Sequence, residues 1–288
     1  MFAVCVFFTV AILTLLALVT GYLISIGAAS LSVDFFTETP TGNATGDIGG
    51  MKHAIAGTAM LVGLASVIGI PIGMLAAVYL AEYEADSWLA APVRFIADVL
   101  AGVPSIVVGI LGYELLVVPF SSGELLGVSI PVLKQLGISG YNGWAGALAL
   151  AFIMIPIVTR TTEEMLRLVP NSYREASVAL GATKARTILR VVLPSATGSI
   201  VTGVMLAVAR VAGETAPLLF TALGSRLMTT DPNQPFPSLT VQIYTYATGP
   251  YPEQKKQAWA GILVLISLIF VLNVAIRFFT RPRGDAAA

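Results

Sequence analysis

Two oppositely charged residues stand out within an otherwise apolar stretch of the sequence. Arg210 and Glu214 lie four positions apart, between roughly residues 197 and 223. In a helix this spacing places both side chains on one face. If the helix crosses a membrane, a charge near the bilayer centre costs about 2.5–3.5 kcal/mol, so both side chains should face the interior of a helix bundle. The pair could fix helix packing or could give an anion path positive potential, and the two roles are compatible.

Other residues with useful chemistry are scarce. Cys5 and His53 are the single cysteine and the single histidine, so an internal disulfide is excluded and a transition-metal site is disfavoured. There is no Walker A motif, because the segment 181–184 lacks the earlier glycine and the Gly-Lys pair. Gly-x-Ser-x-Gly and His-Glu-x-x-His motifs are also missing from the sequence. We therefore expect no enzyme site and no cofactor in this chain, so any energy source must be another subunit.

The composition indicates an environment other than water for most of the chain. Of the 288 residues, 56% are hydrophobic and only 11% are charged, whereas soluble domains carry about 25% charged residues. So few charges cannot cover a water-exposed surface, so most of the surface must face lipid or other apolar helices. The formal net charge of zero gives no support to a nucleic-acid partner.

Six apolar runs approach or exceed the roughly 20 residues that a helix needs to cross a bilayer. They cover about residues 2–28, 54–80, 95–120, 144–159, 197–223 and 258–276. Glu114 interrupts the third run, and Pro156 could kink or end the fourth. The first run could be a signal peptide, but it is longer than the usual apolar region and no basic residue precedes it, which favours a retained helix. Gly69 and Gly73 predict close helix packing in the second run, with a hinge beside Pro71 as the alternative.

The basic residues predict how these helices are oriented, because cytoplasmic loops carry an excess of Lys and Arg. With the N-terminus inside, the cytoplasmic segments hold Arg94, Arg160, Arg167, Arg174, Lys184, Arg186, Arg190, Arg277, Arg281 and Arg283. The outer segments hold half as many, namely Lys52, Lys134, Arg226, Lys255 and Lys256. We therefore expect both termini, and the large basic loop between the fourth and fifth spans, in the cytoplasm.

This basic loop contains helix signals of its own. Ser172 and Glu175 form a possible capping box, and a short amphipathic helix would place together Tyr173, Ala176, Ala179 and Leu180. Gly181 is positioned to end that helix in a left-handed cap. A second helix is expected from about Thr183 and should stop before Pro194. The expected result is a bent pair of helices beneath the membrane, suited to a groove on a partner.

The same loop resembles a known family. The segments Glu175-Ala176-Ser177, Gly181-Ala182 and Leu193-Pro194 match the "EAA" loop of permeases in binding-protein-dependent ABC importers, in sequence and in spacing. Serine at position 177 is a departure, since alanine is commoner there. The resemblance implies that residues 162–194 form the coupling loop that docks on an ATPase subunit. It implies coupling roles for Tyr173, Glu175, Ala176, Leu180, Gly181 and Ala182.

A narrower resemblance covers roughly residues 54–276. The segments that carry it are 104–109, 160–170, 213–222, 239–246 and 258–260. Together they look like the PstA-type permeases of phosphate importers. The sister permease of that system has a similar Gly-Glu-Thr segment but does not usually continue Ala-Pro-Leu-Leu-Phe, as this chain does after Thr215.

This narrower resemblance implies an assembly. A PstC-type sister permease would pair with the chain in the plasma (inner) membrane of a prokaryote, and two PstB-type ATPase subunits would bind below. A PstS-type phosphate-binding protein would dock outside, near the proline-rich segment 224–257, where residues 239–246 are apolar enough to lie at the outer interface. Residues 29–53 are rich in glycine and look flexible.

The resemblance also adds Arg160 to the candidate path. We hypothesise that Arg210 and Arg160 flank a route for phosphate, with Glu214 moderating the field of Arg210 and Thr215 as a candidate pore-lining residue. Thr221 is an alternative pore-lining residue, although most intramembrane threonines bond to their own helix. For Glu114, a packing role, a proton site and a boundary role stay open.

The sequence thus predicts an all-α polytopic membrane protein of one domain (1–288), with about six transmembrane helices and a cytoplasmic coupling loop. The predicted function is a permease subunit for inorganic phosphate. Two alternatives stay open: an ABC permease for another oxyanion, such as molybdate, sulfate or phosphonate, and a self-contained secondary transporter or channel.

Overall fold

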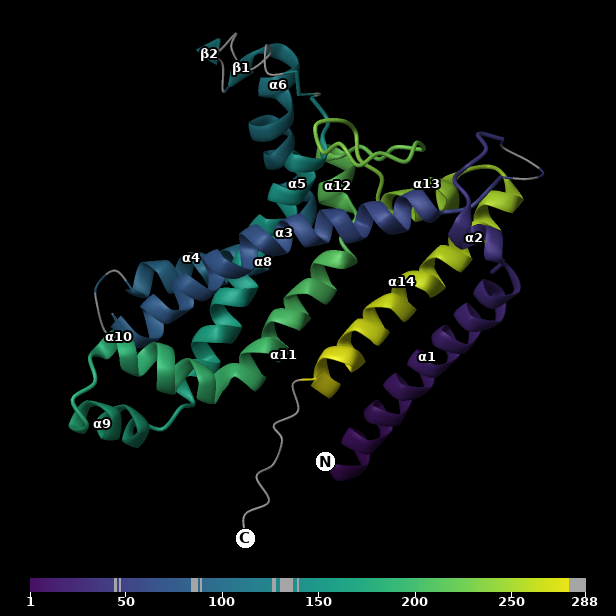
Figure 1. The fold of residues 1–288 in the computed structure, drawn as a ribbon. Coiled ribbons are helices and arrows are strands. Elements are labelled where there is room, and N and C mark those ends of the chain that lie inside the picture. Colours follow the sequence, from purple (N-terminus) through teal and green to yellow (C-terminus); the bar gives the residue numbers. More distant parts are fainter. Residues whose placement is uncertain are drawn as a thin grey trace.

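The computed structural model describes residues 1–43, 46, 48–83, 88, 90–125, 128–129, 137–138 and 140–279. Helices dominate this part of the chain (Figure 1), and a single antiparallel hairpin joins β1 (Glu124–Leu125) to β2 (Val128–Ser129). Six of the described helices are long and apolar enough to cross a membrane, and they cover Phe2–Ala29, Lys52–Tyr83, Ser105–Ser122, Gly143–Arg167, Lys184–Ala212 and Pro252–Ala275. The expected all-α fold with six spans is confirmed.

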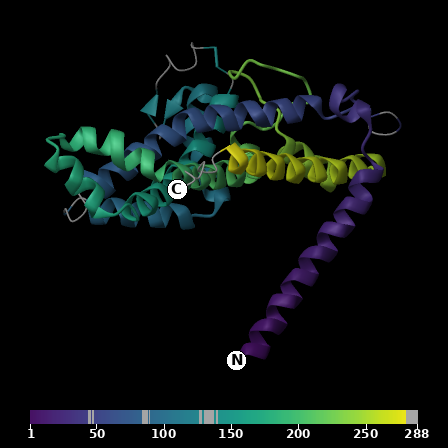
Figure 2. The same cartoon turned by 60° about the horizontal axis from the view of Figure 1, so that its bottom comes forward.

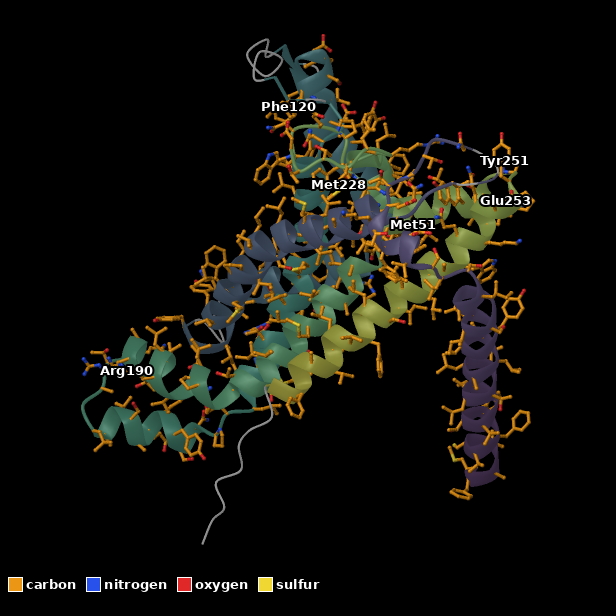
Figure 3. The ribbon with its side chains drawn as sticks, turned by 45° about the vertical axis from the view of Figure 1, so that its right-hand side comes forward. Met51, Phe120, Arg190, Met228, Tyr251 and Glu253 are labelled. Atoms are coloured by element: carbon orange, nitrogen blue, oxygen red, sulfur yellow. The ribbon has the colours of Figure 1, made fainter. Side chains whose placement is uncertain are left out.

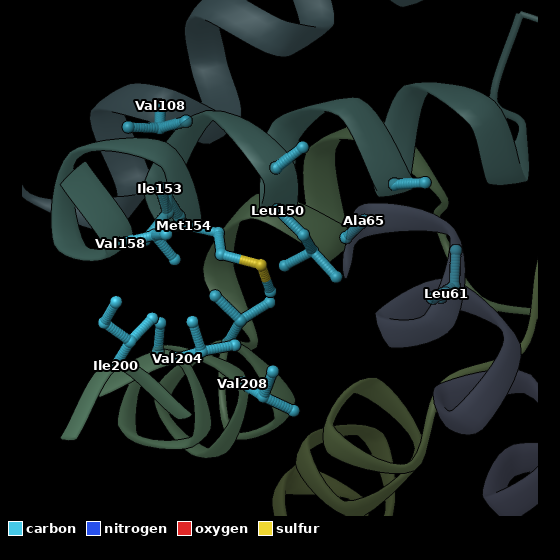
Figure 4. Packing of buried hydrophobic residues seen from close by; sticks show 14 of the residues in the cluster. Leu61, Ala65, Val108, Leu150, Ile153, Met154, Val158, Ile200, Val204 and Val208 are labelled. Atoms are coloured by element: carbon cyan, nitrogen blue, oxygen red, sulfur yellow. The ribbon is translucent and has the colours of Figure 1, made fainter. Parts of the chain in front are cut away.

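The centre of the bundle is the pair α3 (Lys52–Val78) and α8 (Gly143–Arg167). A Cβ atom placed on Gly69 would lie 3.2 Å from the Met154 side chain, and one on Gly73 would lie 2.8 Å from Val158. The two glycines therefore let the helices approach closely, as their spacing predicts. Pro156 lies inside α8 without ending it. Buried aliphatic side chains of α3, α8 and α11 (Leu193–Ala212) fill the core between them (Figure 4).

The third predicted span is wrong as a continuous helix. The run splits at Pro104, which separates α4 (Ala90–Gly102) from α5 (Ser105–Gly112). Proline disfavours helical geometry in the residue before it, and Pro104 itself has extended backbone geometry as the N-cap of α5. The span begins only there, and it continues through the π-helical segment η2 (Tyr113–Val117) into α6 (Val118–Ser122).

The fifth span also differs from the prediction at both ends. The second helix of the basic loop does not stop before Pro194, because α10 (Lys184–Thr187), the π-helical segment η3 (Ile188–Val192) and α11 run on as one rod. In η3 the N–H of Leu193 donates a hydrogen bond to the carbonyl oxygen of Ile188, five residues earlier. This wider turn lies directly before Pro194, which has no backbone N–H to donate. At its other end α11 stops at Ala212, and α12 (Ala216–Thr221) follows after a break.

The end opposite the basic loop is more ordered than expected. Within the segment that looked flexible, the described residues form α2 (Val33–Thr37), and the chain then returns through a bridge between Pro40 and Gly49. Also at this end lie α13 (Leu239–Thr248) and the start of α14 (Pro252–Phe279). A second apolar cluster joins these elements, with Phe35, Met51, Leu239, Tyr246 and Ala258 among its buried members. Residues 239–242 and 246 are thus buried in the fold, whereas Tyr244 and Thr245 are exposed; a place at the outer interface stays a prediction.

The helix α1 (Phe2–Ala29) stands away from the bundle (Figure 2). It meets α14 at its C-terminal end, where the rings of Tyr22 and Trp259 pack edge to face at 5.7 Å. There, Gly27 also lies against Leu263. None of its most apolar window is buried within the chain.

Replacing Gly57 with alanine is expected to destabilise the protein. The new Cβ atom would lie 2.1 Å from the Pro237 carbonyl oxygen, so α3 and the segment before α13 would have to move apart. Such overpacking typically costs about 1–3 kcal/mol, and a lower melting temperature in detergent would report it. Gly63→Ala is the matched control, because a Cβ atom there meets nothing within 4 Å. Equal melting temperatures for the two variants would contradict the close contact.

Candidate functional site

The basic loop folds as the bent helix pair that its sequence predicts. The first helix, α9 (Asn171–Ala179), ends where Gly181 adopts a φ of +83°, the left-handed geometry that glycine tolerates best. The second begins at Thr183, whose hydroxyl accepts a hydrogen bond from the Arg186 N–H at 3.4 Å. The predicted capping box is wrong, because the helix starts two residues early, at Asn171, and Ser172 lies inside it without a side-chain cap.

The exposed surface of this loop has no partner among the residues that the structure describes. An open groove of about 510 Å³ runs between its two helices, lined by Tyr173, Ala176, Ser177, Leu180, Gly181, Ala182, Arg186, Arg190 and Val191. The side chain of Leu180 is 89% exposed. An exposed apolar patch with a basic rim is typical of a protein-binding surface. Of the six residues with implied coupling roles, all but Glu175 line the groove, and Glu175 is exposed on the same helix.

The segments predicted to be inner and outer gather at opposite ends of the molecule. Arg190 of the loop lies at one end, while Met51, Tyr251 and Glu253 lie at the other (Figure 3). These positions agree with the alternation that the predicted topology requires. Which end faces the cytoplasm stays a prediction from the positive charges.

Arg210 and Glu214 do not share a helix face as predicted. Arg210 is near the end of α11, whereas Glu214 lies in the break after it, where the Thr240 hydroxyl donates to the Glu214 carbonyl oxygen at 2.9 Å. The closest approach of the two charged groups is 4.0 Å, between Nη2 and Oε1. Arg210 is 54% exposed and Glu214 is largely covered. The guanidinium is thus only loosely neutralised and is open to another anion.

The two threonines near this break differ in their surroundings. Thr215 is partly buried and is the N-cap residue of α12, without a side-chain capping bond. Thr221 is fully buried and donates to the Pro217 carbonyl oxygen of its own helix at 2.7 Å. Thr221 therefore satisfies its hydroxyl locally, as most intramembrane threonines do. Glu114 lies in η2 and is exposed on the surface of this chain.

Arg160 is held by carboxylates and is not brought next to Arg210. Its Nε donates to Asp98 of α4 at 2.8 Å, and its Nη1 lies 3.8 Å from Glu163. The neighbouring Thr161 packs against Gly203 of α11. Along the bundle, Arg160 is therefore at about the level of Gly203. Arg210 is seven residues beyond Gly203, so it lies about 10 Å farther along the bundle.

A buried carboxylate near Arg160 was missed by sequence reasoning. Glu163 is 1% exposed and accepts from Arg94 Nε at 2.6 Å and from Arg167 Nη2 at 2.8 Å. Arg94 also donates to the Leu80 carbonyl oxygen at 3.0 Å. The helical spacing of Arg160, Glu163 and Arg167 could have indicated part of this network. Arg94 is distant in sequence, so only the fold brings it in.

Removing the Glu163 carboxylate is expected to destabilise the end of the bundle that carries the basic loop. Glu163→Ala would leave Arg94 and Arg167 without their shared acceptor, and breaking a buried ion pair costs about 3–5 kcal/mol. Because the arginines remain partly solvated, we expect a smaller cost, about 2–3 kcal/mol. Thermal unfolding in detergent measures the change, with exposed Glu164→Ala as the control. An unchanged melting temperature for Glu163→Ala would contradict this role.

No cluster of three or more metal-ligating side chains occurs in the described ranges of the chain. The charged groups that the fold does assemble are the loosely paired Arg210 and the network around Glu163. Together with the groove of the loop, they suit an anion route and a protein contact rather than covalent chemistry.

Comparisons with known proteins agree with this arrangement. The family "Binding-protein-dependent transport system inner membrane component" matches residues 69–282. The phosphate transport system permease protein PstA of Yersinia pestis is 44% identical over 252 residues, which cover 87% of this chain and 79% of that protein. The PstA protein of Haemophilus influenzae is 42% identical, over 89% of this chain and 84% of its own length.

A solved structure extends the likeness to the whole fold. A chain of a bacterial ABC transporter involved in the import of the acidic polysaccharide alginate superposes with a TM-score of 0.67, covering 99% of this chain and 96% of that one. Its sequence identity of 13% supports the fold alone. By its sequence relatives and its helical architecture, this chain belongs to the binding-protein-dependent inner membrane permeases, and among them to the PstA-type permeases.

Proposed function

We propose that this chain is the PstA-type permease subunit of an ATP-driven importer for inorganic phosphate. The observation that carries the proposal is the exposed groove of the bent loop, in a chain whose relatives at 40–44% identity are named phosphate permeases. A self-contained transporter would have no use for an unpartnered apolar surface at its basic end. The rival explanation, a surface helix lying on the membrane, predicts no retained ATPase.

The proposed assembly places one partner at each exposed surface. A PstC-type permease completes the membrane pore, and two PstB-type ATPase subunits bind below, one of them on the groove of this loop. A PstS-type phosphate-binding protein docks at the opposite end, above α13 and the segment before it. Both termini lie in the cytoplasm, the membrane is the plasma (inner) membrane of a prokaryote, and ATP is hydrolysed only by the partners.

The proposed path uses Arg210 as its principal attraction for the anion. A translocation site must bind strongly enough to admit an ion and weakly enough to release it. A guanidinium 4.0 Å from Glu214 meets both needs, because the carboxylate reduces the field without occupying the donors. Arg160 is more fully compensated by Asp98, so its contribution at the inner end is weaker, and Thr215 offers a hydroxyl beside Glu214.

The proposed transport cycle is a rigid-body switch. ATP-driven closure of the two ATPase subunits moves the loop, and the attached helices then open the path alternately to each side. The continuous rod from Lys184 to Ala212 suits this role, because it joins the loop directly to the break beside Arg210.

Purification of the intact membrane complex tests the proposal. We expect an ATPase subunit and a second permease to co-purify with this chain, and we expect purified binding protein to stimulate phosphate uptake into proteoliposomes. Molybdate, sulfate and phosphonate are the competitors. Uptake that follows one of these rather than phosphate would assign the chain to another oxyanion, and a complex without ATPase would reject the importer altogether.

A further inference from the structure

The helix α9 is attached to the bundle in an unusual way. None of its residues is buried, so apolar packing does not fix its position. Its main tie is one side chain, Arg174, which is largely covered at 22% exposed. A hydroxyl contact of 2.9 Å between Ser177 and Thr187 joins it to the second helix of the loop. Apart from its backbone connections to α8 and to the rod that begins at Lys184, α9 is therefore joined to the bundle mainly by polar contacts.

Arg174 spans two helices of the bundle at once. Its Nε and Nη2 donate to the Glu82 carboxylate, the shortest bond being 2.6 Å, and Glu82 is 5% exposed. Its Nη1 donates to the Val169 carbonyl oxygen at 2.6 Å, and its Nη2 donates to that of Leu166 at 2.9 Å. Leu166 lies in the last turn of α8 and Val169 lies just beyond its end, where helix carbonyls lack intrahelical partners. The guanidinium is thus a three-way connection among α9, α8 and the end of α3.

Glu82, which accepts the hydrogen bonds of Arg174, belongs to the π-helical segment η1 (Tyr79–Tyr83), which continues α3. Tyr83, the residue after Glu82, lies under the ammonium group of Lys184, which is 5.0 Å from the centroid of the tyrosine ring. Consecutive residues of η1 thus contact each of the two loop helices. Short π-helical segments often mark functional positions in helices.

The opposite end of α3 is tied just as closely to the far surface. The Thr58 hydroxyl accepts from the Leu239 N–H at 2.7 Å, and Gly57 lies against the Pro237 carbonyl. From Thr58 to Glu82 the helix spans about 36 Å. A displacement of η1 would therefore be transmitted along α3 to the segment that leads into α13.

We propose that the Arg174–Glu82 ion pair is the joint through which the coupling loop moves α3. This inference rests on the proposed function, because the ATPase must supply the movement. Arg174 is a positioning residue, facing the bundle, whereas the groove that takes the ATPase is lined by other residues of α9. Breaking the joint should therefore separate ATP hydrolysis from transport without removing the docking surface.

The test uses the complete complex in proteoliposomes, with ATP hydrolysis and phosphate uptake measured in the same sample. The variants are Arg174→Gln, Glu82→Gln and the two combined. We expect each to retain the ATPase subunits and to hydrolyse ATP within about twofold of wild type, while uptake per ATP falls at least about tenfold. The double variant should be no worse than either single one, because both changes break one contact.

Two further variants complete the experiment. Arg174→Lys should fall between wild type and Arg174→Gln, since an ammonium group keeps the charge but cannot bridge the carboxylate and both carbonyls. Glu164→Gln removes an exposed carboxylate from the same end of the bundle and should leave uptake per ATP unchanged.

Wild-type uptake per ATP in Arg174→Gln and Glu82→Gln would overturn the inference. So would loss of the ATPase subunits from these variants, because Arg174 would then act by docking. A wild-type complex that holds no ATPase, or that does not transport phosphate, would instead overturn the proposed function.

Discussion

Leu180→Asp is expected to release the ATPase subunits and to abolish uptake. Leu180 is the most exposed large apolar residue of the loop and lines its groove. Burying a leucine side chain contributes about 1.5–3 kcal/mol, and an aspartate in its place would also bring an uncompensated charge into the contact. We therefore expect binding of the ATPase subunit to weaken at least about 100-fold. Co-purification and ATP-driven uptake measure the two effects.

The control for this change lies on the same helix. Val178 is also exposed but is not part of the groove lining, so Val178→Asp should retain the ATPase subunits and most uptake. Because neither side chain is buried in this chain, both variants should fold and insert normally. Full ATPase retention by Leu180→Asp would show that the groove is not the docking surface.

Arg210→Ala is expected to reduce phosphate uptake to less than about 1% of wild type while the complex remains assembled. Its guanidinium is the loosely neutralised cation of α11, and an alanine would leave Glu214 to repel an entering anion. The Arg210 guanidinium and the Glu214 carboxylate are 4.0 Å apart, and two unit charges at this distance attract each other by about 4 kcal/mol in a medium of intermediate dielectric. Uptake at saturating binding protein, with the amount of complex measured in parallel, gives the result.

Two companions make the Arg210 experiment decisive. Arg210→Lys keeps a positive charge but loses the planar fork of donors, so we expect partial uptake. Arg226→Ala removes an exposed arginine of the segment between α12 and α13 and should leave transport nearly unchanged. Undiminished uptake by Arg210→Ala would remove this residue from the path.

Predictions from the sequence are correct where the local backbone geometry requires a particular type of residue. Gly181 ends α9 because its φ of +83° suits glycine, and Gly69 and Gly73 lie where α3 closely approaches α8. The six spans follow from apolar length alone. These features depend on a few neighbouring residues, so one sequence is enough to predict them.

The prolines show why other boundaries could not be predicted. Pro104 separates two helices, Pro156 lies within α8, and Pro194 lies in the first turn of α11 directly after a π-helical turn. All three lack a donor N–H, and the outcome depends on whether the surroundings can donate a hydrogen bond to the carbonyl oxygen left without a partner. That information is tertiary. The same limit applies to Glu163, whose partner Arg94 is 69 residues away.

The isolation of α1 has a consequence for how the protein tolerates sequence change. Apart from its last turns near Trp259, this helix gains its place from the transfer of apolar side chains into lipid, a quantity that depends on total hydrophobicity rather than on shape. Exchanges among leucine, isoleucine, valine and phenylalanine over its first turns should therefore be silent in this subunit taken alone. Any position there that proves sensitive would reveal a neighbouring protein rather than a feature of this chain.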